Sequence, residues 1–276
     1  MTLNGAAQRA RAETTSEPGA LVGEGDPSPI DVAGASPAVL AIHGYGATPL
    51  EVQLVTDVAA GLGLRAHAPL LPGHGTHAKD LVRTDFGQWS QAVEQAFDDL
   101  AGSNGSVIVV GISLGSLLAA HLALVRPERM LGLGMLSNAT RLSPLTAALP
   151  LHLVERLRIR DFWVPKNGAD IADPVARATQ LTYNVQPVYG GIEVMNAGAR
   201  IERLLPRISR PAFIAHGLHD HVCPVENAQR VANGLASREK TVLILPRSRH
   251  IVTRDFDRTL LAGELRDFIA TLAGMR

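Results

Sequence analysis

Residues 107–116 read VIVVGISLGS: four β-branched apolar residues, then the pattern G-x-S-x-G with Ser113 at its centre. A helix-forming run from Leu117 to Leu124 follows. The order of strand, small-residue turn and helix is typical of a nucleophile elbow, in which the serine adopts a strained backbone and its neighbours must be small. Because the pattern also arises by chance, its meaning depends on whether the chain supplies a base, an acid and an oxyanion hole.

The bulk composition fits a globular protein with a sizeable core. The chain has 276 residues, of which 46% are hydrophobic and 19% charged, and its 26 basic side chains balance 26 acidic ones. This balance argues against a nucleic-acid or anionic-membrane partner. The single cysteine, Cys223, rules out a disulfide framework and fits a reducing compartment. Without an apolar run long enough for a membrane span or a secretory signal, we expect a cytoplasmic protein with no stable membrane insertion.

Strand-like and helix-like segments alternate along most of the chain. This alternation predicts an α/β fold with a mostly parallel sheet and helices on both faces. We expect a disordered lead-in over 1–18, a core formed by 19–137 and 211–276, and an inserted helical cap over 138–210. The cap sequence has broken helical stretches, around 145–157 and 187–204, and no clear strand. The buried strands are expected at 39–42, 64–68, 107–110, 130–136, 212–215 and 242–245.

Two residues after strand ends are candidates for the base and the acid that Ser113 requires. In an open parallel sheet, catalytic groups lie just beyond the carboxyl ends of the strands. Of the ten histidines, only His250 follows the final strand. The loop after 130–136 has no carboxylate, whereas the loop after 212–215 contains Asp220. The order Ser113, Asp220, His250 is the order expected for an α/β-hydrolase triad.

An oxyanion hole requires two backbone N–H donors. The elbow supplies the N–H of Leu114. The glycine-rich loop that begins at His43 follows the first buried strand, and there we assign the second donor to the N–H of Tyr45. Thr48, Pro49 and Glu51 then have the pattern of a capped helix start.

Histidines near Asp220 also suggest a metal site. His216, His219 and His221 cluster there, and His74 and His77 occur in an earlier loop. Adjacent residues of one loop cannot all point at one ion, and a metal would leave the elbow without a purpose. We therefore predict a serine mechanism with no metal and no cofactor.

Several linked motifs resemble the α/β-hydrolase superfamily, and more closely bacterial monoacylglycerol lipases and related small carboxylesterases. The resemblance extends from about residue 19 to residue 275. The motifs are HGYGATP at 43–49, GHGTH at 73–77 with Asp80, Thr84, Phe86 and Trp89 downstream, DHVCP at 220–224, and SRH at 248–250 followed by Asp255.

This resemblance implies a serine esterase that acts on monoacylglycerols or other short-to-medium-chain esters, with a mobile cap lining the acyl site. Two positions depart from the family pattern. Ser116 stands where the family often has Gly. Asn184 stands where some members carry an acidic residue, and it is a candidate for binding a glycerol hydroxyl because an amide both donates and accepts hydrogen bonds.

Other functions are compatible with the same residues. A thioesterase, an acyltransferase and a C–C bond hydrolase would each use this triad. A protein of another class, a ligand-binding sensor with low turnover, would keep the pocket. The expected ligand in every case is a small-molecule ester or lipid, and the sequence identifies no partner protein.

Overall fold

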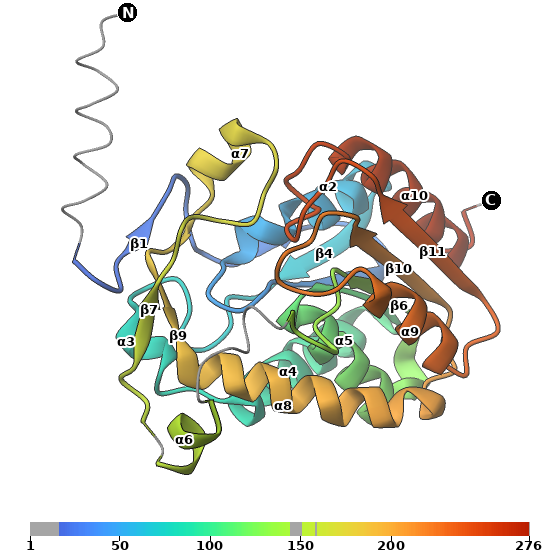
Figure 1. The fold of residues 1–276 in the computed structure, drawn as a ribbon. Coiled ribbons are helices and arrows are strands. Elements are labelled where there is room, and N and C mark those ends of the chain that lie inside the picture. The colour runs from blue at the N-terminus through green and yellow to red at the C-terminus, as the bar shows by residue number, and fades with distance from the viewer. Residues whose placement is uncertain (1–16, 144–150, 158, 276) are drawn as a thin grey trace, which may run out of the picture.

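The computed structural model describes residues 17–143, 151–157 and 159–275 (Figure 1). A seven-stranded sheet in the order β11-β10-β6-β5-β3-β4-β2 forms its centre, with every neighbouring pair parallel except β2 and β4. The sheet strands are β2 (Ile30–Val32), β3 (Ala35–Ile42), β4 (Leu64–Ala68), β5 (Val107–Ile112), β6 (Met130–Leu136), β10 (Ala212–Gly217) and β11 (Lys240–Leu245).

Helices cover both faces of this sheet, which is the arrangement predicted from the alternating sequence. The β-branched residues of β5 alternate between the faces: Val107 and Val109 contact one hydrophobic core, and Ile108 and Val110 contact the other. The first core contains residues of α4 (Phe86–Asn104), α5 (Leu114–Val125), α8 (Val188–Leu204) and α9 (Glu226–Gly234). The second contains residues of α2 (Gln53–Gly61) and α10 (Arg258–Leu272).

The chain between β6 and β10 leaves the sheet and contains small elements of its own. The described elements there are α6 (Leu151–Arg156), β7 (Trp163–Pro165), α7 (Pro174–Thr179), β8 (Thr182–Tyr183), β9 (Val185–Pro187), α8 and η3 (Leu205–Arg207). The expectation of no strand in 138–210 is therefore wrong. β7 pairs with β9, and β8 pairs with β1 (Leu21–Val22), all antiparallel. Strands of two or three residues are too short to show an alternating pattern in the sequence.

Residues 19–22 join the insertion rather than the sheet. Besides the β1–β8 pairing, Ala20 bridges to His77 and the Ala78 N–H donates to Gly19 O (2.9 Å). This segment therefore connects the insertion to α3 (Ala78–Leu81). Residues 1–16 of the predicted lead-in lie outside the described part of the chain. No helix in the described part is both long and apolar enough to cross a membrane.

The predicted helix start after the glycine-rich loop takes a different form. Thr48 has the extended backbone of an N-cap, but its hydroxyl makes no capping bond, and η1 (Pro49–Val52) precedes α2. The Glu51 side chain is buried and accepts a hydrogen bond from the Gly44 N–H (2.7 Å). The expected capping role of Glu51 is therefore wrong, because the carboxylate turns inward to a loop amide instead of to its own helix.

The close approach of α5 to the end of β3 gives the first testable prediction. A Cβ added at Gly115 would collide with the backbone carbonyls of Ile42 and His43. We expect Gly115→Ala to lower the free energy of unfolding by about 3 kcal/mol, measured by urea denaturation. Gly102→Ala in α4 is the control, because a Cβ there meets no atom within 4 Å. It should raise stability by roughly 0.5–1 kcal/mol. Equal stabilities of the two variants would contradict this packing.

Candidate active site

Ser113 lies at a sharp turn between β5 and α5, with φ 55° and ψ −117°. Positive φ is uncommon for a residue with a side chain and marks a strained position. The turn is possible because Gly111 and Gly115 approach each other so closely that a Cβ on Gly111 would collide with the Gly115 carbonyl. The Ser113 N–H is bonded to Leu136 O (3.0 Å), which ties the turn to the end of β6. This local geometry is that of the predicted nucleophile elbow.

Ser116, the departure from the family pattern, has a defined structural role in this turn. Its hydroxyl donates to Ser113 O (2.6 Å) and accepts the Ala139 N–H (3.4 Å). Ser116 is fully buried. A serine at this position therefore fits the elbow and adds hydrogen bonds to the turn and to the beginning of the insertion.

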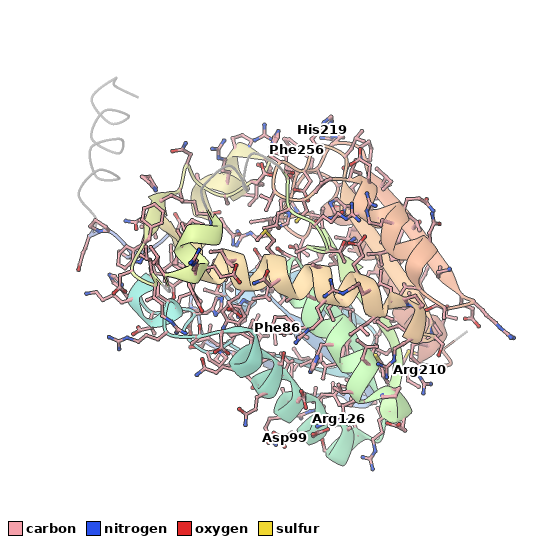
Figure 2. All side chains as sticks on the ribbon, turned by 60° about the horizontal axis from the view of Figure 1, so that its bottom comes forward. Phe86, Asp99, Arg126, Arg210, His219 and Phe256 are labelled. Carbon is pink, nitrogen blue, oxygen red and sulfur yellow. The ribbon has the colours of Figure 1, made fainter. Side chains whose placement is uncertain are left out.

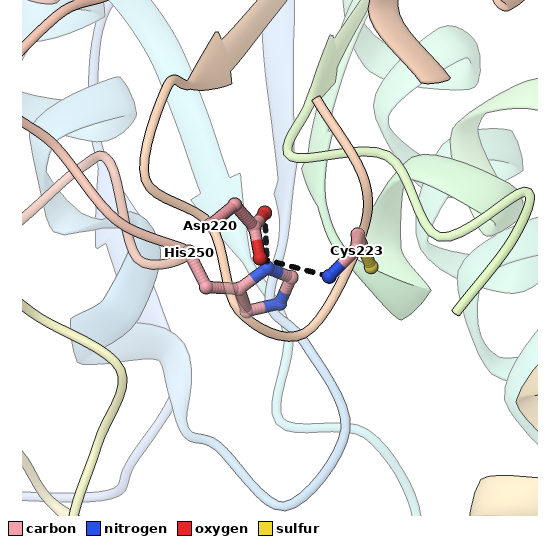
Figure 3. A group of neighbouring side chains, drawn as sticks. All are labelled: Asp220, Cys223 and His250. Atoms are coloured by element: carbon pink, nitrogen blue, oxygen red, sulfur yellow. Dashed lines mark hydrogen bonds and ion pairs between the residues drawn. The ribbon is translucent and has the colours of Figure 1, made fainter. Parts of the chain in front are cut away.

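The predicted base and acid are brought together from two loops beyond the ends of β10 and β11. His250 Nδ1 lies 2.8 Å from Asp220 Oδ2 (Figure 3). The other carboxylate oxygen, Oδ1, accepts the N–H groups of Val222 and Cys223 (2.8 Å each). Because Nδ1 of a neutral His250 donates to the carboxylate, the unprotonated nitrogen is Nε2. This is the tautomer that a general base needs.

The charges of this pair shift the pKa of each partner. Burial alone would favour neutral forms, raising the pKa of Asp220 and lowering that of His250. The mutual attraction of the two groups outweighs burial, so the pKa of Asp220 lies well below its usual value and the pKa of His250 well above. Asp220 is therefore ionised at neutral pH, and it stabilises the positive charge that His250 acquires when it accepts a proton.

His216 also lies beside Asp220, in a role that the sequence analysis, which considered it as a metal ligand, did not predict. It lies on β10, is fully buried, and its Nε2 is 3.0 Å from Asp220 Oδ2. Asp220 is therefore surrounded by two imidazoles and two backbone N–H groups. A histidine near the end of a buried strand, four residues before the acid, was the available signal. Considered as a metal ligand, it could not be recognised as a donor to Asp220.

The predicted oxyanion loop is fixed by the side chain of His43. Its Nε2 accepts the Leu71 N–H (3.1 Å), so Nδ1 carries the proton and donates to Gly44 O (2.9 Å). Burial lowers the pKa of His43 to about 4, which keeps this tautomer neutral. Sequence reasoning assigned the loop's importance to its backbone alone and missed this side chain.

The two predicted donor groups belong to backbone next to the elbow. A Cβ on Gly44 would be 3.2 Å from Ser113 Cβ, so the loop lies directly against the serine. In the described part of the chain, the N–H groups of Tyr45 and Leu114 donate to no protein acceptor. The Tyr45 hydroxyl, in contrast, donates to Pro187 O (3.0 Å) and anchors the loop to the insertion.

Two carboxylates hold the loops of the acid and the base against the insertion. Asp170 accepts the backbone N–H groups of His221 (3.0 Å) and His250 (3.3 Å). Asp255 accepts the N–H groups of Ala172 (2.8 Å) and Arg249 (2.8 Å). Asp255 was part of a quoted motif without an assigned task, and Asp170 was not recognised from the sequence.

Asn184, the predicted substrate-binding residue, is hydrogen-bonded to residues 17–20. Its Oδ1 accepts the Gly19 N–H (2.8 Å) and its Nδ2 donates to Glu17 O (3.0 Å). Its backbone N–H donates to Ala20 O (3.1 Å). The described contacts of Asn184 therefore hold the segment just before β1, and its role toward a substrate stays a prediction.

The histidines of the metal alternative have separate partners. His221 binds Asp170 (2.8 Å), His216 faces Asp220, and His219 is exposed at the surface (Figure 2). Among the described residues, the one group with three possible ligand atoms within 4.8 Å of one another comprises Asp220, Cys223 and His250. Both oxygens of Asp220 already accept hydrogen bonds from within the protein. This donor set fits an acid–base pair better than a metal centre.

Comparison with known proteins identifies the class to which this fold and site belong. A family model described as "Serine aminopeptidase, S33" (Hydrolase_4) matches residues 34–257, which is most of the chain. The chain therefore belongs to this hydrolase family.

Individual relatives and solved structures agree with this assignment. The chain is 29% identical over 240 residues to a thermostable monoacylglycerol lipase of Bacillus sp. (strain H-257), covering 86% of this chain and 91% of the relative. It is 26% identical to the human mitochondrial palmitoyl-protein thioesterase ABHD10, over 87% of this chain and 75% of that relative. A solved structure from work on the metagenome-derived lipolytic enzymes LipS and LipT aligns with a TM-score of 0.80 at 29% identity. The alignment covers 89% of this chain and 98% of that structure's chain. The predicted fold and family resemblance are confirmed.

The Asp220–His250 pair gives a prediction on pH dependence. Labelling of Ser113 by a fluorophosphonate should accelerate with rising pH along a limb centred above ~6.5, because imidazolium cannot accept the serine proton. Asp220→Asn should slow labelling by about 10³–10⁴-fold. It should also move the limb to lower pH, since the charge that raises the pKa of His250 is gone. Asp173→Asn, at the N-cap of α7, is the matched control and should label normally. An unchanged limb in Asp220→Asn would contradict the pairing.

Proposed function

We propose that this hydrolase is a serine esterase that cleaves monoacylglycerols or other short-to-medium-chain acyl esters through an acyl-enzyme intermediate. The observation that carries the proposal is the hydrogen-bonded pair of His250 and Asp220 (2.8 Å), formed beyond the sheet that presents Ser113 on a strained elbow. A serine hydroxyl is a weak nucleophile at neutral pH and requires such an oriented base. The lipases and esterases among the relatives support ester hydrolysis as the reaction.

In the proposed mechanism, His250 Nε2 accepts the proton of Ser113 as its hydroxyl oxygen attacks the ester carbonyl. Asp220 keeps the imidazole in the required tautomer and stabilises its positive charge. His250 then donates that proton to the departing alcohol, leaving the acyl group on Ser113. Water enters, loses a proton to His250 and attacks the acyl-enzyme, and the proton returns to Ser113 as the carboxylic acid leaves.

The backbone N–H groups of Tyr45 and Leu114 are the proposed donors to the developing oxyanion. Each belongs to backbone fixed by its surroundings, one by His43 and the Tyr45 hydroxyl, the other by the start of α5. Donors that are oriented before the reaction need no reorganisation during it, which is the source of their effect on rate. Neither donor has a competing protein acceptor in the described part of the chain.

The substrate proposal depends on the insertion between β6 and β10. Its residues Thr182 and Pro187 are bonded to the oxyanion loop, through Gly46 O (3.0 Å) and the Tyr45 hydroxyl (3.0 Å). The proposed cap thus borders the site where the acyl group would lie. The similarity to a monoacylglycerol lipase over nearly the whole chain favours an acylglycerol.

A thioesterase is the second candidate, favoured by the similarity to a palmitoyl-protein thioesterase. The same nucleophile and oxyanion hole act on thioesters, since the leaving thiolate needs less protonation than an alkoxide. Acyl transfer and C–C bond hydrolysis use the same groups, and a ligand-binding sensor would keep the fold with little turnover.

Removal of the nucleophile tests the mechanism and separates an enzyme from a sensor. Ser113→Ala should retain the wild-type melting temperature but hydrolyse a p-nitrophenyl ester at least 10³-fold more slowly, because no acyl-enzyme can form. The fluorophosphonate should label the wild type at Ser113 and not the variant. Ser103→Ala, on the exposed part of α4, should behave as wild type. Slow turnover by a labelled wild-type protein would favour the sensor, and wild-type activity in Ser113→Ala would exclude the mechanism.

A substrate panel tests the specificity. We expect the highest kcat/KM on monoacylglycerols with short-to-medium acyl chains, and lower values on triacylglycerols and on p-nitrophenyl esters of graded length. The panel should include an acyl thioester and an aminoacyl p-nitroanilide, the latter because the family is described as serine aminopeptidases. A preference for the thioester of tenfold or more would favour the second candidate.

A further inference from the structure

We propose that Glu51 is a positioning residue of the oxyanion hole, holding the loop segment whose Tyr45 N–H receives the oxyanion. The inference rests on the function proposed above and extends it to a residue that does not touch the reacting atoms. Sequence patterns give Glu51 a helix-capping task, which the structure contradicts. Its carboxylate is instead bonded to Gly44 N–H at 2.7 Å.

Gly44 is confined between Glu51 and the nucleophile. A Cβ at Gly44 would lie 2.9 Å from Glu51 Oε2 and 3.2 Å from Ser113 Cβ. A side chain at residue 44 would therefore crowd both groups. The carboxylate therefore holds the loop at the point where the loop contacts the serine, and a displacement of Gly44 would change the distance from the oxyanion donor to the reacting carbonyl.

Glu51 is itself held from the opposite side of the site. The residue is 5% exposed, and its backbone carbonyl accepts the hydroxyl of Thr253 (2.6 Å), three residues after His250. Glu51 is thus bonded to the oxyanion loop through its carboxylate and to the segment after the base through its backbone carbonyl. A residue tied at both ends can transmit a fixed position to Gly44.

Burial raises the pKa of Glu51, and this is opposed by the Gly44 N–H and by the charges of His250, Lys166 and Arg254. A buried carboxylate costs free energy unless it is well paired. A buried acid that caps no helix is consistent with a task in the neighbouring loop.

The need for this bond follows from the conformational freedom of glycine. Residue 44 has no Cβ to restrict its backbone, so external contacts must define the orientation of the peptide that joins it to Tyr45. His43 Nδ1 holds the carbonyl oxygen of that peptide, and Glu51 holds the N–H on the other side of the Gly44 Cα. With one of the two bonds removed, rotation about Gly44 can turn the Tyr45 N–H away from the oxyanion.

Two neutral variants of similar size isolate the hydrogen bond from the charge. Glu51→Gln keeps an oxygen acceptor for the Gly44 N–H, whereas Glu51→Met fills the same space without one. We expect Glu51→Gln to remain within about threefold of wild-type kcat on a p-nitrophenyl ester. Glu51→Met should lose tenfold or more in kcat with KM changed less than threefold, since loss of a whole oxyanion donor costs about 10²–10³. Affinity for a trifluoromethyl ketone, which forms an oxyanion on Ser113, should fall in parallel.

Thr48, in the same turn as Glu51, provides the control. Thr48→Val alters a buried hydroxyl in the same turn that has no hydrogen-bond partner in the described chain, and it should leave kcat unchanged. If Glu51→Met does not fold, Glu51→Asp, which retracts the carboxylate by one methylene, takes its place with the same expected loss. A wild-type kcat in both Glu51→Met and Glu51→Gln would overturn the proposal, as would an equal loss in both. Either result, obtained with a wild type that labels and hydrolyses esters, leaves the proposed function intact.

Discussion

The approach of two backbone segments at the centre of the sheet determines where every other group of the site must lie. The carbonyl of Ile42, at the end of β3, lies so close to Gly115 in the first turn of α5 that no side chain fits between them. Because β3 and β5 are parallel neighbours, this approach places the loop after β3 beside the turn after β5. Backbone packing therefore brings the serine and its proposed oxyanion loop side by side.

The buried charge of Asp220 is the second constraint, since an unpaired carboxylate could not remain ionised there. The backbone N–H groups of Val222 and Cys223 donate to it, and the imidazoles of His250 and His216 lie 2.8 and 3.0 Å from it. The backbone donors come from the turn of the acid loop itself, so the position of the charge does not depend on His250. His250 meets a carboxylate that is already fixed. That arrangement suits a base whose imidazole must be oriented at each step of the reaction.

The sequence indicates the parts of the site that depend on one short segment. The elbow, the strand ends and the acid loop each have local patterns, which is why β4 and β6 and the pairing of Asp220 with His250 could be predicted. His43, His216 and Glu51 act through partners distant in the chain or through a local turn whose form the sequence did not define. The sequence around Glu51 has the pattern of a helix cap. The bond that Glu51 makes instead, to the Gly44 N–H, depends on how the loop packs against η1, which the sequence pattern does not define. The role of Asp170 likewise depends on distant residues, because the two backbone N–H groups that it binds lie 51 and 80 residues away in the sequence.

The same long-range contacts indicate how the insertion can influence catalysis without supplying a proposed catalytic group. Asp170 binds the backbone of the base, and Pro187 binds the hydroxyl of Tyr45. The insertion is thus bonded both to the loop of the base and to the loop of the oxyanion hole. Asn184, in turn, ties the insertion to the beginning of the chain. If the proposed substrate binds beneath the insertion, a movement of the insertion would strain these bonds, and the proposed base and oxyanion loop would feel it through Asp170 and Pro187.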